Sequence, residues 1–225
     1  MANTNNAFGF RQFGQREGSA PTAGQEVRLI SSANAMPVFT GDVVALSSGS
    51  VPYIGSVGTS STNGGVAAGA ITTTAYGIFL GCEYYNTNVN RVTWSSYWPG
   101  SGAQGDVKAF VCSNPEQLYI AQGSSGGVLG SSCIGLLVPM SITGSSQGNT
   151  LSGISNMTVQ SSLVTGLSSN GQFLIVDIYS NVAPAGVNGT STGAEGFQIV
   201  VLQPTNFIRR TLTAAAGPPA SFLSS

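Results

Sequence analysis

The sequence predicts an all-β protein, a single β-sandwich or β-barrel domain with an extended N-terminal arm. No long segment keeps the 3.6-residue periodicity of an amphipathic helix. Short runs rich in β-branched and aromatic residues recur along the chain, and clusters of Gly, Ser and Asn separate them. Glycine alone accounts for 31 of the 225 residues. Many short strands joined by turns are typical of sandwiches and barrels.

The expected strands follow one another at short intervals. Residues 37–46 predict strand, turn and strand, with Gly41-Asp42 at the turn. Residues 86–90 predict the turn of a hairpin between two longer runs. Loops are expected at 55–70, 99–105, 122–132, 141–153 and 183–195. The remaining strands are expected at 27–30, 51–54, 75–85, 91–98, 106–112, 117–121, 134–140, 155–160, 173–179 and 197–202.

Three parts are expected along the chain: an extended arm over residues 1–24, a β domain over 25–213 and a flexible tail over 214–225. The arm is polar but carries Phe8, Phe10 and Phe13, with Arg11 among them. One interpretation is that these rings dock on a partner surface, in which case deletion of residues 1–16 leaves the β domain folded. The other is that the rings pack onto the protein's own core.

Charge is scarce in this chain. Only 7% of the residues are charged, and the formal net charge is −1. With seven Lys and Arg spread along the chain, no basic surface for nucleic acid is expected. A nearly neutral surface also gives little repulsion between molecules, so the chain is expected to associate.

The residue types exclude several classes of enzyme. The chain has no histidine, which excludes a Ser-His-Asp or Cys-His arrangement and a His-ligated metal site. The eight acidic residues form no pair at short spacing, so nothing marks out a two-carboxylate glycosidase. The glycine-rich stretches lack the ending of a phosphate loop. We therefore expect no enzyme and no cofactor or metal.

Two of the acidic residues are expected to stabilise turns, and the cysteines are expected to be buried. Gly41-Asp42 and Gly105-Asp106 each precede a strand, where Asp accepts hydrogen bonds from backbone N–H groups. Cys82, Cys112 and Cys133 have no metal-site spacing and are expected as free, buried thiols. The N-terminal residues show no signal-peptide pattern, and no apolar run reaches the length of a membrane span.

An aromatic cluster, Trp94, Tyr97 and Trp98, stands beside a Pro-Gly turn. If the strand stays extended, Trp94 and Trp98 share one face and Tyr97 points to the other. One face is then core, and the other presents an aromatic ring to a protein partner. A sugar platform is the alternative, although no converging polar groups are evident.

Several stretches resemble small virion proteins of tailed bacteriophages. They are MANTNNAFGFRQFG at the start, Val38-Phe-Thr-Gly-Asp-Val-Val-Ala-Leu46, Gly77-Ile-Phe-Leu-Gly81, Ser96-Tyr-Trp-Pro-Gly100, and Gly105-Asp106 with Phe110-Val-Cys-Ser-Asn-Pro-Glu116. They occur in the expected order over about the first 120 residues. The C-terminal half has no such matching stretch, and it is similar only in its general character, with a last β-strand near Phe197 to Leu202.

The resemblance implies a head decoration, or cement, protein. Such a protein binds the outer surface of the capsid, with the major capsid protein and copies of itself as partners, a trimer at local three-fold positions being the expected assembly. It implies no catalytic residue, no nucleic acid and no membrane, and a location on the virion after synthesis in the host cytoplasm. The interface candidates are Phe8, Phe10, Arg11, Phe13, Trp94, Tyr97 and Trp98. The alternatives are a minor head or tail protein and a carbohydrate-binding or sugar-cleaving β domain.

Overall fold

The protein is described by a computed structural model. The described residues are 6–16, 24–46, 53–58, 66–67, 75–124, 127, 129–142, 148–161, 171–179, 198–205 and 207. The expected loop at 183–195 and the expected tail at 214–225 lie outside them.

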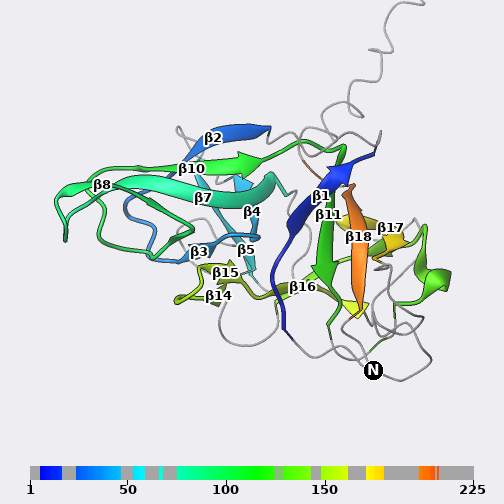
Figure 1. Cartoon of the computed structure of the whole chain (residues 1–225). Helices are drawn as coiled ribbons and strands as arrows, with labels where there is room; N and C mark the ends of the chain where they lie inside the picture. The colour runs from blue at the N-terminus through cyan, green and yellow to red at the C-terminus, as the bar shows by residue number, and fades with distance from the viewer. Residues whose placement is uncertain are drawn as a thin grey trace, which may run out of the picture.

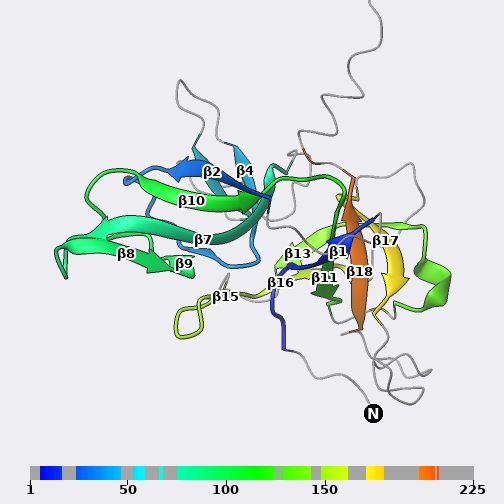
Figure 2. The same cartoon turned by 45° about the horizontal axis from the view of Figure 1, so that its top comes forward.

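Two large sheets make up most of the fold, and they lie side by side in Figures 1 and 2. The first sheet has the order β1 (Arg11–Gln15), β11 (Gln117–Gln122), β18 (Ile199–Pro204), β17 (Phe173–Ile178) and β12 (Leu137–Val138). The second has the order β2 (Gln25–Ile30), β10 (Val107–Cys112), β7 (Gly77–Asn86), β4 (Val43–Leu46), β5 (Ile54–Gly58) and β6 (Val66–Ala67), with β8 (Arg91–Ser95) also paired to β7. All pairings between named strands are antiparallel except that of β5 with β6.

The described residues also form smaller elements. They are the strand pairs β3 (Val38–Phe39) with β9 (Tyr97–Trp98), β13 (Met140–Ile142) with β16 (Met157–Val159), and β14 (Gly148–Asn149) with β15 (Ile154–Ser155), and one 3-10 turn at Ser131–Cys133. The all-β prediction is confirmed. In the part of the chain that the structure describes, no helix is long and apolar enough to cross a membrane.

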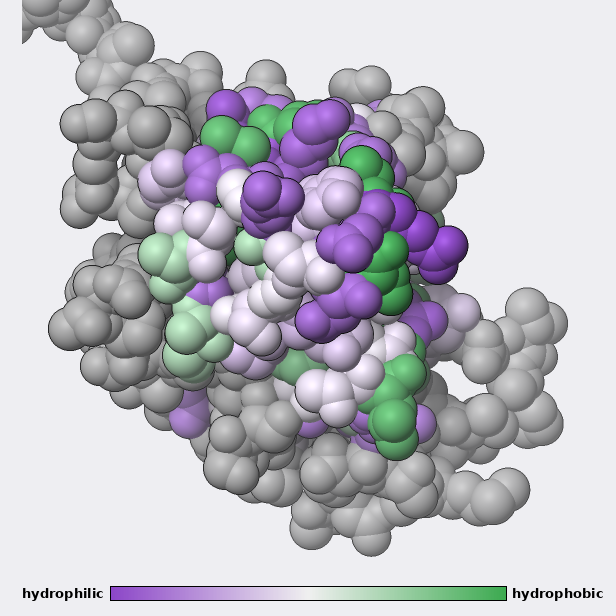
Figure 3. Space-filling model, turned by 90° about the vertical axis from the view of Figure 1, so that its left-hand side faces the viewer, coloured by the Kyte–Doolittle hydropathy of each residue, from purple (hydrophilic) through white to green (hydrophobic). Residues whose placement is uncertain are grey.

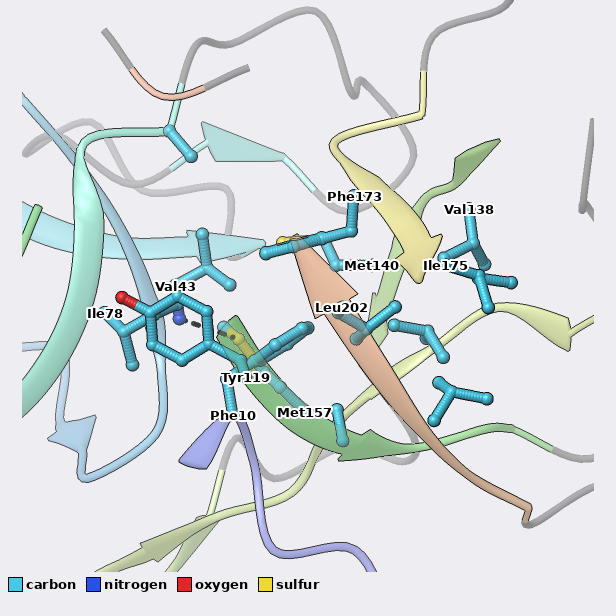
Figure 4. Close-up of a cluster of buried hydrophobic side chains, with 14 of the residues drawn as sticks. Phe10, Val43, Ile78, Tyr119, Val138, Met140, Met157, Phe173, Ile175 and Leu202 are labelled. Carbon is cyan, nitrogen blue, oxygen red and sulfur yellow. Dashed lines mark hydrogen bonds between the residues drawn. The ribbon is translucent and has the colours of Figure 1, made fainter. Parts of the chain in front are cut away.

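The two sheets share an apolar core. Tyr119 and Leu202 contribute to it from the first sheet, and Val43 and Ile78 contribute from the second (Figure 4). The backbone N–H of Val43 donates to Met157 Sδ at 3.2 Å, so a small sheet is joined to the same core. Since burial of each such side chain contributes about 1.5–3 kcal/mol, this core is what holds the sheets together.

A second core lies on the opposite face of the second sheet. It includes Val107, Ala109 and Val111, the aliphatic face that the alternation in this strand predicts. The register between β10 and β7 shifts at Phe110 and Val111, which leaves Leu80 as an extra residue on β7. Because of this bulge Phe79 and Cys82, three residues apart, both point into the second core.

Residues 6–16 are part of the folded domain. β1 pairs with β11 at the edge of the first sheet, and Phe10 is only 1% exposed. Its ring stacks on Phe173, with centroids 4.6 Å apart. Phe10 therefore packs into the protein's own core, the second of the two interpretations of the sequence. Deletion of residues 1–16 is no longer expected to leave the domain folded.

Two other expectations change in detail. The stretch 55–70, expected as a loop, contains most of β5 and all of β6. The run 134–140, expected to be buried, begins with an exposed Ile134 and is buried only from Leu137 onward. The 3-10 turn just before Ile134 explains this, because the strand begins only at Leu137.

Candidate interaction surface

The best-connected charged and polar side chains of the described residues join elements of the fold. No group of three or more His, Cys, Asp or Glu there could hold a metal ion. The main polar cluster is that of Glu26, Arg28, Tyr76 and Ser113. Glu26 forms an ion pair with Arg28 and accepts from the hydroxyls of Tyr76 and of Ser113, the latter at 2.8 Å. The pKa of Tyr76 is raised by burial and by its hydrogen bond to Glu26. The cluster ties β2 to the start of β7 and the end of β10.

The two Gly-Asp turns behave as predicted. Asp42 is fully buried, and its Oδ2 accepts from the backbone N–H of Phe39 at 2.9 Å. Asp106 Oδ1 accepts from the backbone N–H of Ser32 at 3.2 Å, and its Oδ2 accepts from the Tyr53 hydroxyl at 3.0 Å. That hydrogen bond raises the pKa of Tyr53. Both carboxylates therefore fix loops.

The predicted aromatic cluster is divided by a bend at Ser96. Ser95 Oγ accepts from the backbone N–H of Tyr97 at 3.2 Å and donates to its carbonyl at 2.6 Å, which separates β8 from β9. Trp94 is 64% exposed on β8, whereas Trp98 is 0% exposed on β9. The run therefore does not stay extended, which was the condition for placing the two tryptophans on one face.

Burial removes one member of the cluster from the interface candidates. Trp98 Nε1 donates to the carbonyl of Asn34 at 3.0 Å, and its ring meets Tyr84 edge to face with centroids 5.4 Å apart. A partner cannot reach it in the folded protein. Tyr97 is half-buried and stacks on Phe39 with centroids 5.3 Å apart. Trp94 is the exposed ring of the three.

The N-terminal candidates also differ in accessibility. Phe10 is a core residue and cannot serve as an interface residue. Phe8 is half-buried, and the Arg11 guanidinium lies 5.4 Å from the centre of its ring. Phe13 is 46% exposed and meets Tyr179 edge to face, with centroids 5.6 Å apart. These residues lie on or beside β1 in the first sheet, so the structure does not bring them together with Trp94 in the second.

The β7–β8 hairpin concentrates exposed apolar side chains. Of the eight large hydrophobic side chains exposed among the described residues, four belong to it: Tyr85, Val89, Val92 and Trp94. Tyr85 lies directly opposite Val92 in the register, and Glu83 lies opposite Trp94. Directly opposite residues of an antiparallel pair share one face, so these side chains form one surface.

The same face continues across two more strands. Lys108 of β10 lies opposite Glu83, and Leu29 of β2 lies opposite Lys108. Phe110 and Val27 form the next pair along the same two strands. We call this surface the outer sheet face, and its members are Val27, Leu29, Glu83, Tyr85, Val92, Trp94, Lys108 and Phe110.

Little charge interrupts the outer sheet face. Its two charged residues face each other, with Lys108 Nζ 3.8 Å from Glu83 Oε2. Gly81 lets the indole of Trp94 lie against β7, because a Cβ at Gly81 would come within 3.0 Å of Trp94 Cζ2. A flat ring beside a neutralised ion pair and aliphatic groups is suited to contact with a protein.

Figure 3 views the molecule from the side that lies at the left of Figure 1, where the β7–β8 hairpin projects. Apolar groups, in green, lie there among pale and hydrophilic ones. Of the interface candidates predicted from sequence, only Trp94 belongs to the outer sheet face. Sequence reasoning missed Val27, Leu29, Tyr85 and Val92. The sequence does carry a signal for this surface. In these strands apolar residues stand at both odd and even positions, so each face of the sheet has apolar side chains.

Comparison with protein-family models, with curated proteins and with solved structures found no match for this chain.

Proposed function

We propose that this chain is a structural virion protein that binds the outer surface of a phage capsid and stabilises the head lattice. The observation that carries the proposal is the outer sheet face, an exposed apolar surface over four strands in a chain with very little charge. The identity of the partner, the major capsid protein, rests on the resemblance to phage virion proteins. The role requires binding and no chemistry.

The resembling stretches contact each other inside the fold. The backbone N–H of Phe10 donates to the carbonyl of Gly41 at 3.0 Å, which joins the Phe-Gly-Phe-Arg stretch to the Thr-Gly-Asp turn. The stretch 38–46 also pairs with the stretch 96–100, because Val38 and Phe39 lie opposite Trp98 and Tyr97. The resemblance therefore concerns residues that specify packing, and it supports a shared fold more than a shared contact surface.

The energetics favour a partner that presents many sites. Full burial of a large apolar side chain contributes about 1.5–3 kcal/mol. The four most exposed apolar members of the outer sheet face are about half buried already, so they contribute roughly 3–6 kcal/mol together. Association alone costs about 4 kcal/mol or more. One face therefore binds weakly, and attachment at several linked points on a lattice supplies the missing affinity.

Co-sedimentation with purified capsids of the phage that encodes the chain tests the proposal. We expect the wild-type protein to sediment with capsids, and Val27→Asp to lose at least about tenfold in affinity because it places a carboxylate on the apolar face. Leu151→Asp is the matched control, since Leu151 is exposed on the β14–β15 hairpin, away from the outer sheet face. No sedimentation of the wild type, or equal loss in both variants, contradicts the proposal.

Trp94 supports a carbohydrate-binding function as the second candidate. It is the exposed indole of the cluster, and the Glu83 carboxylate stands opposite it. Binding on a glycan array that is lost in Trp94→Ala favours this function over capsid binding. The buried Trp98 is unsuited to this test. A minor head or tail protein is distinguished from a decoration protein by copy number in the particle.

A further inference from the structure

Within the part of the chain that the structure describes, β8 is an edge strand with β7 on one side and no strand on the other. It pairs with β7 in a continuous register over Arg91 to Ser95. Among the described residues no other strand pairs with it. The β14–β15 hairpin contacts Thr40 and lies past the end of β8, where a Cβ on Gly153 would meet the side chain of Ser96. The backbone of β8 therefore offers hydrogen-bonding groups to a further strand.

The other edges of the two large sheets carry features that discourage strand addition. β1 bears Arg11 and has a bulge between Gln12 and Gly14. β2 carries Glu26 and Arg28, and its Leu29 is bridged to Tyr53. β6 and β12 have two residues each. Charges, bulges and short length are the usual protections of sheet edges.

β8 has almost none of these protections. Its sequence is Arg-Val-Thr-Trp-Ser, with one charge at its first residue. Val92 is 59% exposed and Trp94 is 64% exposed. The pairing with β7 contains no bulge. An exposed, regular, apolar edge strand is a template for pairing with another chain.

We propose that two copies of this chain pair through their β8 strands, antiparallel, about a two-fold axis at Thr93. The second sheet of one copy then continues into the second sheet of the other copy. The occupant of the β8 edge is a second copy because the strand is complementary to itself. The proposal does not require capsid binding, although Val92 and Trp94 belong both to the outer sheet face and to this edge.

The sequence of β8 selects the register. With the axis at Thr93, Val92 lies opposite Trp94 of the other copy twice, and Thr93 lies opposite its counterpart. Both kinds of cross-strand pair are favourable. Arg91 lies opposite Ser95, so the one charge of the strand never faces its own copy. With the axis at Val92, Trp94 would lie opposite Asn90, whose φ of 50° ends the strand. With the axis at Trp94, Val92 would lie opposite Ser96, where the chain bends.

The area indicates the strength of this contact. A buried tryptophan covers about 150–250 Å². Two Trp94 and two Val92 side chains, each partly exposed, bury several hundred Å², which is below the roughly 1,200 Å² of standard interfaces. The dimer is therefore weak and concentration-dependent, with a dissociation constant of about micromolar or weaker.

Disulfide trapping tests the register. Directly opposed residues of an antiparallel pair have Cα atoms about 4.5–5.5 Å apart, which a disulfide spans. Thr93→Cys replaces a hydroxyl and a methyl group by one thiol at a half-buried position. It is made with Cys133→Ser, because Cys133 is partly exposed whereas Cys82 and Cys112 are buried. Under mild oxidation we expect a cross-linked dimer. Val89→Cys, in the turn of the hairpin, is the control and stays monomeric.

Sedimentation of the unmodified chain provides a second measurement that needs no cysteine variant. We expect a dimer fraction that rises with concentration and falls at least about tenfold in Val92→Asp, which buries a carboxylate against Trp94. A wild type that is monomeric up to about 1 mM, or that forms trimers, overturns the proposal. So does a wild-type dimer in which Thr93→Cys cross-links no better than Val89→Cys.

Discussion

Two glycines let the N-terminal segment dock on the turn before β4. Gly9 has a φ of 69°, and a Cβ there would lie 2.6 Å from the Cβ of Ser155. Gly41 has a φ of 94°, and a Cβ there would lie 3.0 Å from the backbone nitrogen of Phe10. Both positions need a left-handed backbone and close approach, which glycine alone provides without strain.

Gly41→Ala is expected to lower the free energy of unfolding by about 1–3 kcal/mol, from backbone strain alone. Gly14→Ala is the control, since nothing lies within 4 Å of a Cβ at that position. Urea denaturation of the two variants measures the difference. Equal stability of Gly41→Ala and the wild type would show that Phe10 does not dock on this turn.

Burial in the second core raises the pKa of the Cys82 thiol from 9.0 to about 12. The folded state therefore keeps the proton at pH values where the unfolded chain has lost it. The free energy of unfolding keeps its full value below a pH of about 9, the pKa of this thiol in the unfolded chain. It falls as the pH rises toward 12, by at most about 1.4 kcal/mol per pH unit. Cys82→Val is expected to flatten this decline between pH 9 and 11 in urea denaturation. An unchanged slope contradicts the burial of the thiol.

At the scale of the element, β1 closes the first sheet and brings Phe10 into its core. Deletion of residues 1–16 removes a strand together with a buried ring, and Phe10→Ala alone is expected to cost about 3–5 kcal/mol. Phe13→Ala, at an exposed position of the same strand, is expected to cost much less. Thermal unfolding of the three variants checks this order. A truncated chain as stable as the wild type contradicts the assignment of β1 to the domain.

Strand positions could be predicted from the sequence where apolar residues alternate clearly. The run over 106–112 and the hairpin turn at 86–90 are examples, since local periodicity and turn residues determine them. The pairing of strands could not be predicted. The turn at Gly41-Asp42 was identified, yet β3 pairs with β9 and β4 pairs with β5 and β7. Contacts between residues distant in sequence decide those partners.

The interaction surface was predictable only in part. Trp94 was named from composition, but its separation from Trp98 depends on the hydrogen bonds of Ser95 with Tyr97. Val27 and Tyr85 join the outer sheet face through the order of β2, β10, β7 and β8. Phe10 carried no local sign of burial, because its neighbours in the core come from strands far along the chain.

At the scale of the whole molecule, lack of charge is the dominant property. With 7% charged residues and one ion pair on the outer sheet face, binding is expected to depend mainly on apolar contact. Capsid affinity should therefore change by less than about twofold between low and high salt, since few counterions are released or screened. Co-sedimentation at several salt concentrations measures this. A tenfold loss at high salt indicates an electrostatic interface instead.

The central claim is that this chain decorates a capsid in many copies. Quantitative mass spectrometry of purified particles, with the major capsid protein as internal reference, tests it most directly. The account predicts a copy number in simple proportion to that of the major capsid protein. Particles that lack the chain, or that carry only a handful of copies, contradict it.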